Sequence, residues 1–116
     1  MSDRLVLRVV FFRTESGREP VREWLLELDK EDRKVIGEDV KLLQFRWLLG
    51  MPLVRKLESD LWELRSHLSS GRIARICFTV RSDEMALLHG FIKKAQKTPL
   101  QDLELARDRR NLWLNG

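Results

Sequence analysis

The sequence predicts an α+β fold, in which an antiparallel, four-stranded sheet with one mixed edge carries an N-terminal helical hairpin and a C-terminal helix. Three observations predict it. A valine-rich apolar run precedes two segments of helical periodicity, the middle of the chain changes to a period of two, and a helix start follows the last apolar run. The chain of 116 residues suits one hydrophobic core, so we expect a single domain over residues 1–116.

The N-terminal half predicts one strand and two helices. Residues 5–12 are nearly continuously apolar, as in a strand that is covered on both faces. Pro20 suits the first position of a helix. The apolar positions that follow it recur at helical spacing: Val21, Trp24, Leu25 and Leu28. Asp29 and Asp32 can cap a second helix, which Gly50 stops. Its apolar stripe consists of Ile36, Val40, Leu43 and Trp47.

The middle of the chain predicts an antiparallel meander of three strands. Apolar and charged side chains alternate over residues 61–68, so one face is buried and the other carries charge. Residues 69–71 and 81–84 have the composition of turns. Residues 74–80 and 85–92 are rich in the apolar and β-branched side chains of buried strands.

A helix is predicted after the third of these strands. Thr98 suits the N-cap, Pro99 the first helical position and Gln101 the capping-box position. Residues 100–114 then follow helical spacing, with Leu103, Ala106 and Arg110 on one side. The predicted order of elements is therefore βααβββα.

Composition is that of a folded, soluble domain. Hydrophobic residues make up 43% and charged residues 34% of the chain, unlike a disordered tail or a membrane protein. The longest apolar runs contain Arg8 or His89 and fall short of a membrane span, and the N-terminus lacks a signal-peptide pattern. We therefore expect a cytoplasmic protein, and its net charge of +4 favours an anionic partner.

The single cysteine and the two histidines limit metal and redox chemistry. Cys77 cannot form an internal disulfide and lies in an apolar strand, so it is either a packed core thiol or a nucleophile. The histidines lie far apart in sequence, without the spacing of metal ligands. We expect no metal and no cofactor.

Basic residues of the three meander strands can converge on one face of the sheet. They are Arg65 from the first strand, Arg72 and Arg75 from the second, and Lys93 and Lys94 from the end of the third. Such a cluster can bind phosphate through charge-assisted hydrogen bonds and stabilise the charge that develops in phosphoryl transfer. The alternative is a set of solvated cations on the exposed face of a half-buried sheet.

Three further residues have both a functional and a structural interpretation. His89 is either an acid–base group near the cations or a core histidine satisfied by a hydrogen bond. Glu63 is either a general base in a basic pocket or the ion-pair partner of Arg65 or Arg75. Trp113, near the chain end, either marks a partner surface or packs a helix.

Four segments of the sequence resemble one protein family. They are WELR (62–65), GRIARICF (71–78), LLHGFIKKAQKTP (87–99) and ELAR (104–107). Their succession is similar to the RelE/HigB superfamily, the bacterial toxins of type II toxin–antitoxin systems, and most similar to its phage-derived, HigB-like branch. The resemblance covers nearly the whole chain, with the specific motifs in the C-terminal half, and implies a RelE-like fold.

The resemblance implies a ribosome-dependent RNA endonuclease, an mRNA interferase that inhibits translation. Such toxins enter the ribosomal A site and cleave the message there, with the ribose 2′-hydroxyl attacking the adjacent phosphate and no metal or cofactor taking part. The resemblance also implies a cognate helix-turn-helix antitoxin, and contact with operator DNA only through the antitoxin complex. It implies no membrane partner.

The resemblance also implies roles for the basic residues. Arg65 would contact the phosphate or aid activation of the 2′-hydroxyl, and Arg75 would stabilise the scissile phosphate. Lys93 or Lys94 would stabilise the transition state or protonate the leaving oxygen.

The chain departs from the better-known family members because it contains no tyrosine. Glu63, His89 or a lysine must then serve as acid or base. Base stacking falls to Phe91 or to an arginine plane. Arg72 and Lys97 complete the RNA-binding candidates, and Lys97, just before the helix cap, has the most ordinary surface position. The alternative function is a non-catalytic RNA- or protein-binding module, either a degenerate toxin or a phage regulatory protein.

Overall fold

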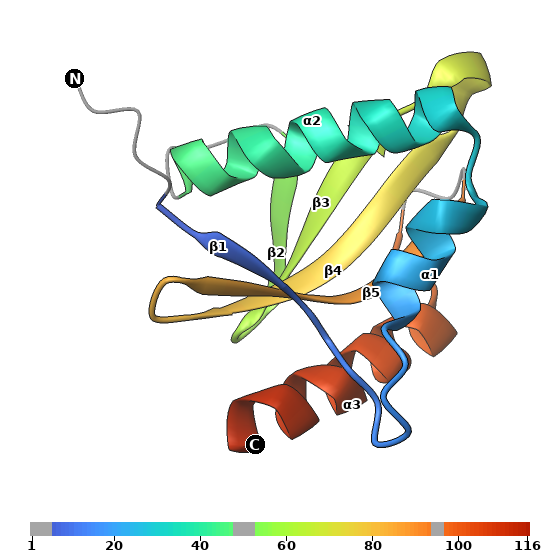
Figure 1. Ribbon diagram of the computed structural model, residues 1–116. Coiled ribbons are helices and arrows are strands. Elements are labelled where there is room, and N and C mark those ends of the chain that lie inside the picture. Colours follow the sequence, from blue (N-terminus) through green and yellow to red (C-terminus); the bar gives the residue numbers. More distant parts are fainter. Residues whose placement is uncertain (1–5, 48–52, 94–96) are drawn as a thin grey trace.

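The computed structural model describes residues 6–47, 53–93 and 97–116, which form a five-stranded sheet between helices (Figure 1). The elements follow in the order β1 (Arg8–Phe11), α1 (Pro20–Glu27), α2 (Lys30–Arg46), β2 (Val54–Glu58), β3 (Leu61–His67), a 3-10 turn η1 (Ser69–Gly71), β4 (Ile73–Arg81), β5 (Glu84–Ile92) and α3 (Leu100–Asn115). The fold class is α+β, as predicted. The predictions that rest on Leu5 and Gly50 lie outside the described residues.

The sheet has the strand order β1-β5-β4-β3-β2. β1 runs parallel to β5 and the other neighbours are antiparallel, which confirms the mixed edge. The predicted count of four strands is wrong, because β2 adds a fifth strand at the opposite edge. Its sequence, VRKLE, places two exposed charged residues side by side, and a β-bulge between Lys56 and Glu58 breaks the alternation by which strands are recognised. The observed order is βααββββα.

Helices cover both faces of the sheet. Figure 1 shows α1 and α2 over one face and α3 over the other. The core under α1 and α2 includes Val21, Ile36, Leu43, Leu64, Ile76, Phe78 and Leu87. The core under α3 includes Phe12, Leu61, Cys77, Ala86, Leu88, Phe91 and Ala106. No helix within the described ranges is long and apolar enough to cross a membrane.

Aromatic side chains fit α1 and α2 to the sheet. A Cβ atom on Gly90 of β5 would lie 2.4 Å from the Trp24 ring of α1, so glycine is needed for this close approach. Trp47 meets Trp62 and Phe78 edge-on, with ring centroids 5.1 and 5.7 Å apart. Trp24, Trp47 and Trp62 all pack, half-buried, against this core.

The predicted helix caps are only partly right. Asp29 is the N-cap residue of α2 but makes no side-chain capping hydrogen bond, and Asp32 lies buried inside the helix. The predicted cap of α3 is wrong, because Pro99 is its N-cap residue. The Thr98 hydroxyl instead donates a 2.6 Å hydrogen bond to the carboxylate of Glu63. A hydrogen bond to a charged carboxylate is stronger than a capping bond between neutral groups.

Candidate nucleic-acid interface

The register of β3, β4 and β5 arranges charged residues in rows. One row, across the three strands, holds Glu63, Cys77 and His89. The next row holds Arg65, Arg75 and Phe91. Side chains two residues apart in a strand point to the same face, and Cys77 and Phe91 belong to the core under α3. Both rows therefore lie on the α3 face of the sheet.

These rows run from beneath α3 toward solvent. The Glu63 side chain is 0% exposed, the Arg65 side chain is 22% exposed, and His67 at the end of β3 is exposed. On β5, Phe91 is buried, but the Lys93 side chain beyond the strand end is 46% exposed. The α3 face thus ends in an accessible, cationic border.

Arg55 is a further cation of this face, on the strand β2 that was not predicted. It lies in register with Glu63 and is exposed. Burial lowers the pKa of the Arg75 guanidinium, Glu63 opposes this effect, and the charges of Arg65 and Arg55 lower the pKa further. Arg55 therefore belongs to the same electrostatic cluster as the other two arginines. We call Arg55, Arg65 and Lys93 the basic margin.

Glu63 is fully buried and holds the two central arginines. Its Oε1 lies 3.0 Å from Nε of Arg65 and 3.5 Å from Nη1 of Arg75. Its Oε2 accepts the hydrogen bond from Oγ1 of Thr98. A substrate in solvent cannot reach a buried carboxylate whose two oxygens are both engaged. The geometry therefore favours the ion-pair interpretation of Glu63 over the general-base interpretation.

Arg75 is a cation beneath the surface, with a side chain that is 1% exposed. Although burial lowers its pKa, arginine stays charged in proteins. A phosphate in solvent does not reach this guanidinium in the present conformation. The direct phosphate contact implied by the resemblance would therefore require Arg75 to be uncovered, and in this conformation its guanidinium is the ion-pair partner of Glu63.

His89 is bound by an aspartate of α3. Its Nε2 lies 2.7 Å from Oδ1 of Asp102, and Oδ2 of the same carboxylate lies 3.4 Å from Nζ of Lys93. The His89 ring stacks on Phe91, with centroids 5.4 Å apart. This packing leaves Phe91 7% exposed, so stacking of Phe91 on an RNA base would require its ring to be uncovered. Asp102 therefore contacts both His89 and Lys93, a residue of the basic margin.

Arg72 does not join the other meander cations. Its guanidinium forms a bidentate pair with Asp32 of α2, at 2.9 and 3.0 Å, and these hydrogen bonds raise its pKa. The predicted convergence is therefore wrong for Arg72, because a buried carboxylate on the α2 side of the sheet binds it. Lys97 is exposed, and Lys94 lies outside the described residues.

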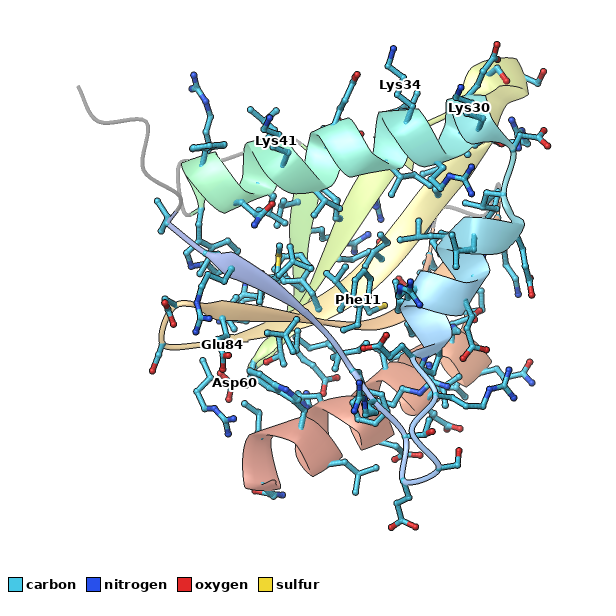
Figure 2. All side chains as sticks on the ribbon, in the orientation of Figure 1. Phe11, Lys30, Lys34, Lys41, Asp60 and Glu84 are labelled. Atoms are coloured by element: carbon cyan, nitrogen blue, oxygen red, sulfur yellow. The ribbon has the colours of Figure 1, made fainter. Side chains whose placement is uncertain are left out.

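Cations also occur away from the basic margin. Figure 2 shows three of them along the outer side of α2: Lys30, Lys34 and Lys41. These exposed lysines fit the alternative interpretation, in which surface cations are simply solvated. The net charge alone therefore does not locate a site. The candidate site is located by the ion pairs of Arg65 and Arg75 with Glu63.

Cys77 is a packed thiol at 0% exposure. Burial raises its pKa well above the ordinary value, which disfavours the thiolate that a nucleophile requires. The nucleophile interpretation of Cys77 therefore fails. Within the described residues, no group of three or more His, Cys, Asp and Glu side chains could hold a metal ion.

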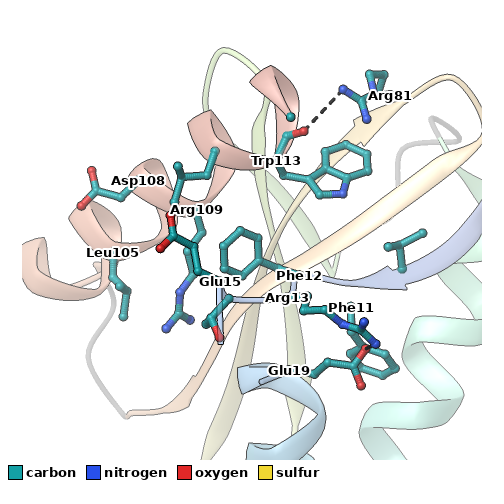
Figure 3. A pocket seen from close by; sticks show the side chains of 14 residues that line it. Phe11, Phe12, Arg13, Glu15, Glu19, Arg81, Leu105, Asp108, Arg109 and Trp113 are labelled. Atoms are coloured by element: carbon teal, nitrogen blue, oxygen red, sulfur yellow. Dashed lines mark hydrogen bonds and ion pairs between the residues drawn. The ribbon is translucent and has the colours of Figure 1, made fainter. Parts of the chain in front are cut away.

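A groove of about 810 Å³ lies between β1, the loop that follows it and α3 (Figure 3). Phe11, Phe12 and Trp113 are among its lining residues. Trp113 packs against the α3 core, and the guanidinium of Arg81 lies 4.4 Å from the centroid of its ring. Trp113 thus has the helix-packing role, and the groove shares no residue with the basic margin.

Comparison with known proteins places most of the chain in a family. The family model described as "Phage derived protein Gp49-like (DUF891)" matches residues 23–111. The chain has no match among the curated proteins. The matched segment runs from α1 into α3 and contains the whole basic margin. The chain therefore belongs to the Gp49-like family of phage-derived proteins, within the RelE/HigB-like group that is associated with toxin–antitoxin systems.

Proposed function

We propose that this protein is the toxin of a type II toxin–antitoxin system, of the HigB-like branch, and that it cleaves messenger RNA in the ribosomal A site. One observation carries the proposal: the cations of the basic margin lie at the accessible end of a face whose buried groups hold Arg65 in place. Family membership and the net charge of +4 support it. Guanidinium and ammonium groups are the protein's usual ligands for RNA phosphates.

In the proposed reaction, the ribose 2′-hydroxyl loses its proton and its oxygen attacks the adjacent phosphorus. The bond from phosphorus to the 5′-oxygen of the next nucleotide breaks, which leaves a cyclic 2′,3′-phosphate and a 5′-hydroxyl. Negative charge grows on the phosphate oxygens during this step, and Arg65 and Lys93 stabilise it.

The buried residues have a positioning role in this proposal. Glu63 holds Arg65 through Nε, and Arg75 balances the charge of Glu63 so that the carboxylate does not cancel the cations of the basic margin. Asp102 holds Lys93 at the end of β5 in the same way. The proposed partner is a cognate helix-turn-helix antitoxin, through which the complex contacts operator DNA.

A translation reaction with intact ribosomes tests the proposed activity. The wild-type protein should cut the message at codon-defined positions, and Arg65→Ala should reduce the cleavage rate by about 100-fold, the usual effect of removing one charge-stabilising donor. Lys41→Ala, which removes an exposed cation on α2, is the matched control and should cleave normally. Equal cleavage by the Arg65→Ala and Lys41→Ala proteins would refute the assigned site, and an intact message with wild type would refute the endonuclease.

The second candidate is a non-catalytic RNA- or protein-binding module. The burial of Arg75 and Phe91 and the absence of tyrosine favour it, because they remove a phosphate contact and two possible stacking groups. Expression of the chain alone separates the two functions. A toxin should arrest growth, and co-expression of a helix-turn-helix protein encoded beside it should relieve the arrest. A binding module should leave growth unchanged.

A further inference from the structure

His67 ends β3 on the α3 face, one row beyond Arg65. It follows Arg65 by two residues in the strand, so its side chain points to the same face, about 7 Å further along. It lies in register with Ile73, whose carbonyl accepts a 3.2 Å hydrogen bond from the backbone amide of Lys93. His67, Ile73 and Lys93 therefore form a third row at the open end of this face. In this row the His67 side chain is exposed.

The other groups near this end that can exchange a proton are buried or engaged. Glu63 is fully buried, with both carboxylate oxygens bound. His89 is 14% exposed, and Asp102 binds it through Nε2. The ammonium of Lys93 is paired with the same aspartate. On the α3 face, within the described residues, His67 is an exposed imidazole, a group that can accept a proton on a ring nitrogen.

We infer that His67 is the general base of the cleavage reaction, and this inference rests on the function proposed above. The imidazole takes the proton of the ribose 2′-hydroxyl while that oxygen attacks the phosphorus. The bond to the 5′-oxygen breaks, and water protonates the departing oxygen, so the step needs no further reactant. Arg65 in the neighbouring row and Lys93 in the same row hold the phosphate, and His67 contacts the ribose directly.

Single-turnover cleavage on message-programmed ribosomes tests this role with the 116-residue chain. His67→Gln should cut about 100-fold more slowly than wild type, within the range that a general base contributes. Binding of the same message with a 2′-deoxyribose at the cut site should change by less than about twofold. Lys41→Gln, a substitution at another exposed position, on α2, is the control and should cut and bind as wild type does.

Chemical rescue separates proton transfer from a structural role. Imidazole added to the His67→Ala protein should restore cleavage by about tenfold or more, because a free base can occupy the space of the missing ring. It should not restore the Arg65→Ala protein, which lacks a phosphate ligand rather than a base. Cleavage by His67→Gln within about twofold of wild type overturns the assignment. So does a loss of binding that equals the loss of cleavage, or a failure of imidazole to rescue. An intact message with the wild-type protein is a different result, because it rejects the endonuclease and this role together.

Discussion

The two faces of the sheet differ in what they bury. Under α1 and α2 the strands bury mainly apolar side chains, with the uncharged Ser66 of β3 among them. Under α3 the strands bury Glu63, Arg75 and Thr79 beside Cys77 and Phe91. A buried ion pair adds little net stability compared with apolar packing of the same volume, because both charges lose their hydration. The apolar packing under α1 and α2 therefore stabilises the fold. The buried charges under α3 add little stability and instead fix the positions of charged side chains.

Removing one member of the buried pair should have the largest effect on stability. Arg75→Met leaves the Glu63 carboxylate buried with less compensation, so we expect a loss of about 3–5 kcal/mol in the free energy of unfolding. Urea denaturation at pH 7 measures it.

The double variant Glu63→Leu/Arg75→Met tests the comparison of the two faces more sharply. It removes both charges, so it should be more stable than Arg75→Met alone, and close to wild type in its unfolding free energy. Ile76→Val on the other face is the control for a simple change in packing and should cost about 1 kcal/mol. A double variant less stable than Arg75→Met would show that the α3 face is built for stability after all.

The apolar face should be sensitive to volume instead of charge. Gly90→Ala places a methyl group against the Trp24 ring, and overpacking of this kind costs about 1–3 kcal/mol. Thermal unfolding followed by circular dichroism measures the loss. Combining it with Trp24→Leu, which removes the ring that the methyl group meets, should make the added methyl nearly neutral. An unchanged melting temperature for Gly90→Ala alone would show that α1 does not pack tightly on β5.

Much of the fold was predictable because its elements follow simple periods. The alternation in β3 and the apolar runs of β4 and β5 identified the meander, and helical spacing identified α1, α2 and α3. β2 was missed because adjacent charges and a bulge interrupt its alternation. Because Arg55 lies on β2, this member of the basic margin was not predicted either.

The residues of the candidate site were predictable only in part, and how deeply each is buried was not predictable. Alternation placed Arg65 and Arg75 on one face, yet it cannot show which charged positions a helix will cover. The docking of α3 decides that Glu63 is buried, that Asp102 reaches His89, and that the Thr98 hydroxyl is a donor rather than a cap. These contacts join residues that are 13 or 35 positions apart in the sequence, so a local sequence pattern cannot predict them.

The smallest change in stability is expected from the partly exposed ion pairs between α3 and β2. Glu58 of β2 accepts hydrogen bonds from Nε of Arg107 at 2.8 Å and from Nη1 of Arg110 at 2.7 Å. These bonds hold the pKa of Glu58 below its ordinary value of 4.5, and the bond from Arg107 has the larger effect. Because the folded-state pKa is the lower one, the stabilisation is complete above the unfolded-state pKa and disappears as the pH falls through the folded-state pKa.

The pH dependence of Glu58→Gln tests this link between α3 and β2. At pH 7 the variant should melt about 2 °C below wild type, because partly exposed ion pairs contribute little. The difference should shrink as the pH falls below about 4, where the wild-type carboxyl group also becomes neutral. Differential scanning calorimetry from pH 7 to pH 3 follows the two melting temperatures. A difference that persists undiminished at pH 3 would mean that the glutamine disturbs packing, and that the charge of Glu58 does not hold α3 against the sheet.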